Sequence, residues 1–455
     1  MTPIPAREVS PSKVAPRRSR RLHTSGTILA AAGLLVIAFA TLRPGGPRFR
    51  PAPGWTCLIC GATGGVDIAL NIFLFIPLGV GLRLRGASIR RAVATAFLVS
   101  LSVELWQNFV VSGRDPSISD VLTNTTGGAL GATITTFAGL WLFPTARRAT
   151  ALALAGLAML AVILTATAVG LQPSIEPRLY YAQIEPRDGN PGPFSGRLLS
   201  TAVNGRPVLY EGELQDPDST PWPVFTDGRL QLDVALVPGP RLVRAPIVRI
   251  TNSRWEAAAL LQERDALVFR ARTRARDARL VTPGLAMNGV LPRTPVASPD
   301  TLRVHALLEQ HGLRVDLTRA GKEESFQLPF RVTLGWFFVL PYFTPAHQYV
   351  IWLSAGWLAA LLVPIGFWSA RAPLGVGVAV LAAAVGLLIL LPLIAHLSST
   401  APLEWAGVAL GFVGGVYLAR LADSRVGHRV ASRARTGGLA DVSEIVPDPL
   451  PSRRT

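Results

Sequence analysis

The sequence predicts a polytopic α-helical membrane protein of about eight transmembrane helices that carries an extracytoplasmic all-β sandwich domain. Three observations lead to this fold class. The 455-residue chain is 49% hydrophobic with a mean hydropathy of +0.37, which is too apolar for an ordinary soluble enzyme. Eight apolar runs have about the length that crosses a bilayer. Between the fifth and sixth runs, residues 172–346 alternate apolar and polar side chains as half-buried strands do.

The eight candidate spans also predict the orientation of the chain in the plasma membrane. An even number of spans places both termini on the same side. With that side inside, the cytoplasmic segments hold 20 Lys and Arg residues, and the short outer loops hold only Arg43, Arg48, Arg50 and Arg114. We therefore expect cytoplasmic termini and an extracytoplasmic segment 172–346, with spans at 25–42, 66–82, 92–111, 120–143, 150–171, 347–368, 374–397 and 403–419.

This distribution of charge accounts for the formal net charge of +17. Residues 172–346 hold 21 basic and 18 acidic side chains, so the excess lies in the cytoplasmic segments. No nucleic-acid-binding motif accompanies it. Membrane lipid is the expected partner, and nucleic acid is not expected.

The chain divides into six parts by composition. Residues 1–24 are rich in Pro, Ser and Arg, and we expect them to be disordered, as we do the basic tail. The first apolar run ends in Ala38-Phe39-Ala40, which also fits a cleaved signal peptide, but a retained anchor is favoured because several spans follow. The predicted parts are the basic N-terminus 1–24, a transmembrane domain 25–143, a helix 150–171, the β domain 172–346, three helices 347–419 and a cytoplasmic tail 420–455.

Polar side chains inside the first spans gather near one membrane face. If consecutive spans run antiparallel, the start of the second, the end of the third and the start of the fourth reach the same depth. Ionisable groups in hydrocarbon cost about 2.5–3.5 kcal/mol each unless they pair or meet water. We therefore predict a polar layer just below the outer surface, made of Asp67, Asn71, Glu104, Gln107, Asn108, Asp120 and Asn124, with Arg114 as the nearest cation.

The spacing within the spans supports one shared face. Glu104, Gln107 and Asn108 are separated by three and four positions, which places them on one side of a helix. The small residues Gly127, Gly128 and Gly131 predict a close helix–helix contact.

A set of polar, glycine and proline positions recurs through the first spans: Asn71, Phe75, Pro77, Gly79, Glu104, Gln107, Arg114, Asp120, Asn124, Gly127, Gly128 and Gly131. With these residues, the segment resembles the VanZ-like family of bacterial membrane proteins over about residues 28–143. The resemblance implies a polytopic membrane protein, in a family named for a member associated with resistance to glycopeptide antibiotics, and it implies no settled biochemical activity.

Residues 172–346 resemble the concanavalin A-like, laminin-G-like jelly rolls. Alternating segments at 230–237, 247–253, 267–276, 302–308 and 313–319 carry the resemblance, and Arg319-Ala320-Gly321 stands where a turn with Asn-Gly is usual. Such folds host carbohydrate binding, adhesion and glycosidase chemistry alike. Four acids lie in a polar turn region, and a solvated loop explains them more simply than the carboxylate pair of a glycosidase does; they are Glu211, Glu213, Asp216 and Asp218. For His305 and His311, we expect a role in packing and not in catalysis.

The only cysteines, Cys57 and Cys60, lie in the first outer loop. A C-x-x-C pair on an oxidising face could close a small disulfide, bind metal with other ligands, or do redox work, and a local disulfide or two unmodified thiols is the favoured interpretation. No nearby histidine or second cysteine pair supports a zinc site. We expect no metal and no cofactor.

Three readings of the polar layer remain open. In the first, a non-enzymatic envelope protein recognises a polar head group, a lipid-linked glycan or a glycopeptide antibiotic. In the second, an intramembrane hydrolase or transferase acts on a lipid-linked precursor with Glu104 or Asp120 as general base. In the third, the polar residues only hold three helices together. The sequence does not indicate an oligomeric state.

Overall fold

The computed structural model describes most of the chain, including every predicted membrane span. The described residues are 17–43, 58–59, 61, 63–111, 117–175, 180–184, 194–208, 212–213, 225, 228–239, 244–252, 255–291, 300–340 and 344–435.

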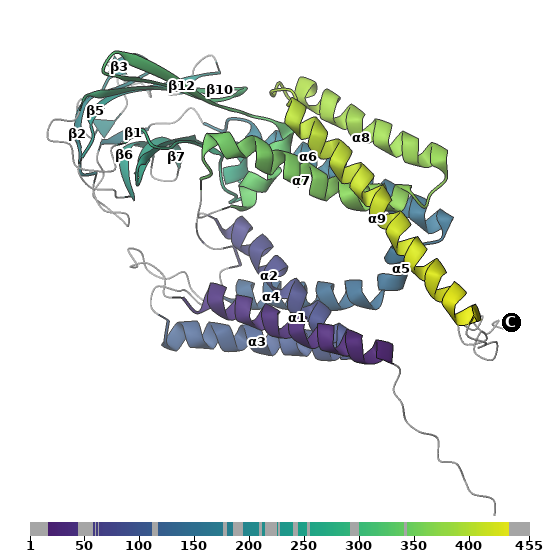
Figure 1. The fold of residues 1–455 in the computed structure, drawn as a ribbon. Helices are drawn as coiled ribbons and strands as arrows, with labels where there is room; N and C mark the ends of the chain where they lie inside the picture. The colour runs from purple at the N-terminus through teal and green to yellow at the C-terminus, as the bar shows by residue number, and fades with distance from the viewer. Residues whose placement is uncertain are drawn as a thin grey trace, which may run out of the picture. The chain divides into compact units, whose positions relative to one another are not determined.

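The chain forms two compact units, and each is described by itself. The first comprises residues 1–142, 169–330 and 334–347, and it contains the N-terminal helices and the β domain. The second comprises residues 143–168, 331–333 and 348–455. Figure 1 shows the course of the chain through helices and strands.

The N-terminal helices are α1 (Arg17–Thr41), α2 (Gly64–Leu84), α3 (Ile89–Phe109), α4 (Ile118–Thr136) and the short α5 (Ala138–Leu142). Helix α2 packs against α1 and α4, and α3 packs against α4 (Figure 1). The starts of α3 and α4 are capped, because Ser88 Oγ accepts from the Arg91 amide and Ser117 Oγ from the Ser119 amide. A serine side chain thus satisfies a free backbone N–H at the start of each of these two helices.

Two glycines of α4 set the distance to α2. A Cβ atom on Gly127 would collide with the Ile72 carbonyl oxygen, and one on Gly131 would collide with the Ile76 carbonyl oxygen. The backbones of the two helices therefore approach closely along this face. Gly128 lies against Ala96 of α3, so the three glycines pack α4 between two neighbours.

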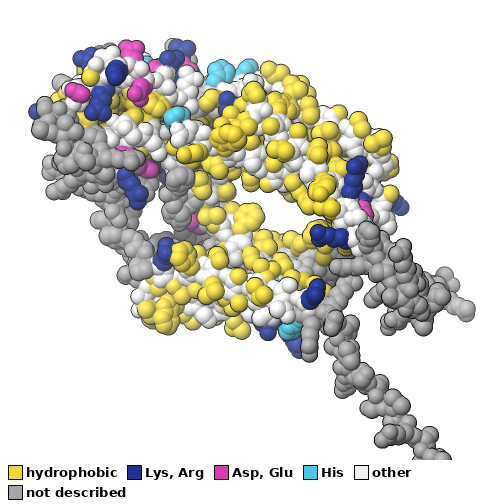
Figure 2. All heavy atoms as spheres, viewed as in Figure 1, with side chains coloured by type: hydrophobic (Ala, Val, Ile, Leu, Met, Phe, Trp, Pro, Cys, Tyr) yellow, Lys and Arg dark blue, Asp and Glu magenta, His cyan; other side chains and the backbone are white. Residues whose placement is uncertain are grey.

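Six of the described helices are long and apolar enough to cross a membrane: α1 from Arg21, α2, and the later helices α6 (Ala146–Leu171), α7 (His347–Ser369), α8 (Leu374–Ile394) and α9 (Pro402–Arg435) up to Arg425. The chain is thus a multi-pass membrane protein. Hydrophobic side chains cover much of the helical surface in Figure 2, where most charges gather over the β domain. Helices α3 and α4 lie in the predicted spans 92–111 and 120–143, but their polar residues make them less apolar than the six helices above. The total of eight spans therefore remains a prediction.

The β domain consists of two six-stranded antiparallel sheets. One has the order β4-β1-β6-β7-β8-β9 and the other β12-β11-β10-β5-β2-β3. Figure 1 shows them as two layers. The first contains β1 (Tyr181–Ile184), β4 (Gly212–Glu213), β6 (Arg244–Thr251), β7 (Glu256–Glu263), β8 (Ala266–Ala271) and β9 (Gly284–Met287). The second contains β2 (Arg197–Val203), β3 (Arg206–Pro207), β5 (Leu230–Val237), β10 (Leu302–Glu309), β11 (Gly312–Arg319) and β12 (Lys322–Pro329).

The alternating segments form strands because one face of each is buried. In β5 and β10 every second side chain is buried, and the side chains between them are more exposed. The hairpin between β11 and β12 turns at Ala320 and Gly321, both with positive φ, as a two-residue hairpin requires. The segment 267–276 differs from the expected continuous strand: β8 ends at Ala271, and a 3-10 turn, η1 (Arg274–Arg276), follows.

Helices α1 and α9 extend into segments that were expected to be disordered. Helix α1 begins at Arg17, inside the segment expected to be disordered, and α9 continues through the expected disordered tail to Arg435. Arginine and alanine are good helix formers, and extending an existing helix costs less than nucleating one. The predicted span 120–143 is interrupted after Thr136, and α5 follows.

In the second unit, α9 packs against α7 through small residues. Cβ atoms on Gly407, Gly411 and Gly415 would collide with α7 carbonyl oxygens. At the start of α9, Glu404 is fully buried and accepts hydrogen bonds from the Thr333 hydroxyl (2.6 Å) and the Ala401 amide (2.7 Å). Glu404 therefore caps its own helix.

Candidate functional site

The predicted polar layer is built from the start of α2, the end of α3 and the start of α4. Asp67 and Asn71 lie in the first turns of α2, Asp120 and Asn124 in the first turns of α4, and Glu104 and Gln107 in the last turns of α3.

Asn71 joins α2 to α4. Its Nδ2 atom donates to Asp120 Oδ1 at 2.8 Å, and both side chains are partly exposed. An ionised acceptor strengthens such a bond relative to one between neutral groups. These two residues form the accessible part of the layer.

Glu104 joins α3 to the start of α4. Its Oε2 atom accepts from the Ser117 backbone N–H at 2.9 Å, and the residue is only 2% exposed. Ser117 is the N-cap of α4, so the carboxylate lies at the positive end of that helix dipole. This contact gives the buried acid a structural role.

Asn124 also bonds to α3. Its Nδ2 atom donates to Ser100 Oγ at 2.9 Å, and both residues are buried. Its Oδ1 atom is buried and accepts no hydrogen bond from the residues that the structure describes. The side-chain amide of Asn124 therefore uses its donor group, while its acceptor oxygen has no partner among the described residues.

Gln107 reaches the end of α1. Its Nε2 atom donates to the Thr41 carbonyl oxygen at 2.8 Å. Thr41 is the last residue of α1, whose final carbonyls have no partner within the helix. The layer thus contacts all four long helices of this region.

The prediction for Asn108 is wrong. Asn108 is exposed, whereas Ser100, Glu104 and Gln107 form the buried face of α3. The spacing of four from Glu104 places Asn108 at the edge of that face, and the helix turns it outward.

Sequence reasoning missed the partners of the layer. Ser100 lies four residues before Glu104 and could have been found by that spacing. The Ser117 amide and the Thr41 carbonyl are backbone groups, and their only signal was their place at helix ends.

Several predicted residues lie outside the described part of the chain. They are Arg114, Cys57, Cys60, Glu211, Asp216 and Asp218, and the side chain of Glu213 is not described either.

His305 of the β domain lies opposite two acids. The strand register pairs it with Asp233 of β5 and Asp316 of β11, and its Nδ1 atom is 2.5 Å from Asp233 Oδ1. Bonds from Ser325 and Arg314, together with the charges of Arg314 and His305, outweigh burial and hold the pKa of Asp316 below its ordinary value. Within the described residues, no group of three His, Cys, Asp or Glu side chains could hold a metal ion.

Comparison with known proteins identifies the N-terminal helices. A family model described as VanZ/LLP1 matches residues 18–141, which run from α1 to α5. No curated protein and no solved structure matches the chain. The jelly-roll resemblance of the β domain therefore remains a prediction, and the helices that build the polar layer lie within the segment that matches the VanZ/LLP1 model.

Proposed function

We propose that this is an envelope protein whose VanZ-like domain recognises a polar head group, a lipid-linked glycan or a glycopeptide antibiotic at the outer membrane face. In this proposal it contributes to glycopeptide resistance without catalysing a reaction. The β domain lies outside the cell and adds contacts to envelope glycan or protein.

The observation that carries the proposal is the difference in exposure within the layer. Glu104 and Asn124 are each 2% exposed, and both bond to a neighbouring helix, so they serve as scaffold. Asp67, Asn71 and Asp120 are partly exposed and lie at the ends of their helices. Their carboxylate and amide groups can accept and donate hydrogen bonds to a polar ligand.

The distribution of basic residues supports placing this layer at the outer face. The end of α2, the start of α3 and the turn between them contain Arg83, Arg85, Arg90 and Arg91, which favours the cytoplasm for these ends of the two helices. A ligand that reaches Asp120 therefore approaches from outside. Arg114, in the loop before α4, is the cation that we expect to meet a phosphate or carboxylate of the ligand.

The decisive experiment separates the exposed acid from the buried one. Asp120→Asn keeps an acceptor for Asn71 but removes the charge, so it should leave a folded protein and abolish the glycopeptide-susceptibility phenotype. Susceptibility of cells that express each variant is compared with the amount of folded protein after detergent extraction. Asn108→Ala, an exposed polar change on α3, is the matched control.

Two results would contradict the proposal. If Asp120→Asn yields no folded protein, the acid holds helices together and need not bind a ligand. If Asp120→Asn changes the pool of lipid-linked precursors through lost turnover, the protein is an enzyme.

A further inference from the structure

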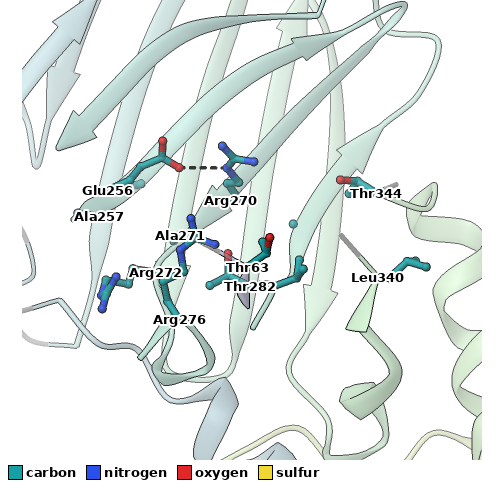
Figure 3. A pocket seen from close by; sticks show the side chains of 13 residues that line it. Thr63, Glu256, Ala257, Arg270, Ala271, Arg272, Arg276, Thr282, Leu340 and Thr344 are labelled. Atoms are coloured by element: carbon teal, nitrogen blue, oxygen red, sulfur yellow. Dashed lines mark hydrogen bonds and ion pairs between the residues drawn. The ribbon is translucent and has the colours of Figure 1, made fainter. Parts of the chain in front are cut away.

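The β domain contains a polar pocket at one end of β7 and β8 (Figure 3). Arginine, glutamate and threonine side chains line it, among them Glu256, Arg270, Arg272, Arg276 and Thr282. Its cavity volume is about 170 Å³. A single buried water needs only about 10–15 Å³, so the pocket has room for a group as large as a phosphate.

Among the described residues, Glu256 is the one carboxylate that lines this pocket, and it is already shared between two arginines. Glu256 Oε1 lies 3.1 Å from Arg270 Nε, the contact drawn in Figure 3, and Oε2 lies 3.3 Å from Arg249 Nε. One carboxylate can balance the charge of only one of these arginines. The positive charge of the lining exceeds the negative charge.

Arg272 is held rigidly beside the pocket. The residue is 5% exposed, its Nη2 atom lies 2.5 Å from Asp277 Oδ1, and its guanidinium lies 4.0 Å above the Trp255 ring. A guanidinium carries five N–H donors, and this ion pair and stacking contact fix its plane without using most of them. Arg272 is therefore a pre-organised donor.

The side chain of Arg276 forms no hydrogen bond and no ion pair with any residue in the described part of the chain, and only its backbone is bonded, to Thr273 and Arg279. It is partly buried on the turn η1. Burial lowers its pKa below the ordinary value, Glu256 opposes this, and the charges of Arg270 and Arg272 lower the pKa further. An anion in the pocket would relieve this repulsion.

The pocket lies beside residues that begin or end membrane helices. Thr63, which directly precedes α2, and Thr344, three positions before α7, both line it. The η1 turn bonds to the residue that follows α6, because the Arg274 amide donates to the Gln172 carbonyl oxygen at 2.9 Å. A pocket next to the ends of transmembrane helices lies at the depth of lipid head groups.

We propose that Arg270, Arg272 and Arg276 bind the phosphate of an anionic lipid head group at the outer membrane surface. Arginine is suited to this ligand because its planar fork matches phosphate oxygens in pairs. Thr282 and Thr344 supply hydroxyl donors. The site is separate from the polar layer of the VanZ-like domain and does not depend on the function proposed for it.

The test measures lipid binding to the full-length protein in neutral detergent. Phosphatidylglycerol is titrated, and the fraction of protein with bound lipid is read by native mass spectrometry. Arg276→Gln should weaken binding about tenfold or more, the usual effect of losing one charge-assisted hydrogen bond. Arg303→Gln removes the same charge from an exposed position of β10 and should leave binding unchanged.

Inorganic phosphate distinguishes a lipid from a soluble ligand. Competition by phosphate against phosphatidylglycerol in the wild type, lost in Arg276→Gln, would support the proposal. Binding of phosphate without any binding of phosphatidylglycerol would overturn it, as would equal lipid affinity of Arg276→Gln and the wild type. If Arg276→Gln fails to fold, Arg276→Lys, which keeps the charge and loses the paired donors, should still bind lipid more weakly, and equal affinity would overturn the proposal.

Discussion

Asn71 of α2 donates a 2.8 Å hydrogen bond to Asp120 of α4, 49 positions later in the chain. The bond fixes the register of two helices whose backbones already touch at Gly127 and Gly131. It also holds one carboxylate oxygen of Asp120 in a defined direction, while both side chains stay partly exposed. A group that orients an acid in this way is suited to presenting it to a ligand.

The bond itself can be measured by a double-mutant cycle. Asn71→Ala and Asp120→Ala should each lower the stability of the purified protein, and the double variant should lose less than the sum. A coupling energy of about 0.6 kcal/mol is expected, since polar pairs between membrane helices average that value. Denaturant unfolding in detergent gives the three differences, and additive losses would show that the two side chains do not interact.

Glu104 should tolerate loss of charge better than loss of its acceptor. Glu104→Gln can still accept from the Ser117 amide, whereas Glu104→Ala leaves a buried N–H without its partner, at a cost of about 1–3 kcal/mol. Thermal unfolding of both variants in the same detergent measures the difference. Equal losses for Gln and Ala would mean that charge, and not the hydrogen bond to Ser117, determines the contribution of this residue.

The sequence predicted that polar residues at the start of α2, the end of α3 and the start of α4 lie near one another, because antiparallel helices of similar length bring these ends together. It could not predict their partners. Glu104 bonds to a backbone amide and Gln107 to a backbone carbonyl, and every residue has such groups. The strands of the β domain were predictable where one face is buried, as in β5 and β10. The arginine pocket was not, because Arg270, Arg272 and Arg276 meet only after β8 ends at Ala271 and the chain turns.

The glycines of α4 should not tolerate even a methyl group. Gly127→Ala introduces a Cβ into the space of the Ile72 carbonyl oxygen, and such overpacking costs about 1–3 kcal/mol. Gly139→Ala is the matched control in α5, because a Cβ there meets nothing within 4 Å. Thermal stability in detergent should fall for the first and stay equal or rise for the second. A Gly127→Ala protein as stable as the wild type would show that α2 and α4 can separate freely.

Asp316 should make the stability of the β domain depend on pH at the acidic end. Its pKa is lowered in the folded state, so the unfolded chain binds a proton more readily. Ionised Asp316 therefore stabilises the folded state. This contribution to the free energy of unfolding is fully present above the ordinary pKa of 3.8 and is lost as the pH falls through the folded pKa. Unfolding followed between pH 2 and pH 6, a range of roughly two units around that value, should show a smaller acid-induced loss in Asp316→Asn. Ser325→Ala, which removes one donor, should give an intermediate profile; a wild-type profile for Asp316→Asn would contradict this assignment.

The orientation of the chain can be tested by labelling at two exposed arginines. Arg303 lies on β10, and Arg90 lies in the first turn of α3. In a background with Cys57→Ser and Cys60→Ser, a membrane-impermeant maleimide should label Arg303→Cys in intact cells, and Arg90→Cys only after the membrane is opened. The expected difference follows from the basic residues of the α2–α3 connection, which favour the cytoplasm. Labelling of Arg90→Cys in intact cells would reverse the orientation and place the polar layer at the inner face, where an antibiotic outside the cell could not reach Asp120.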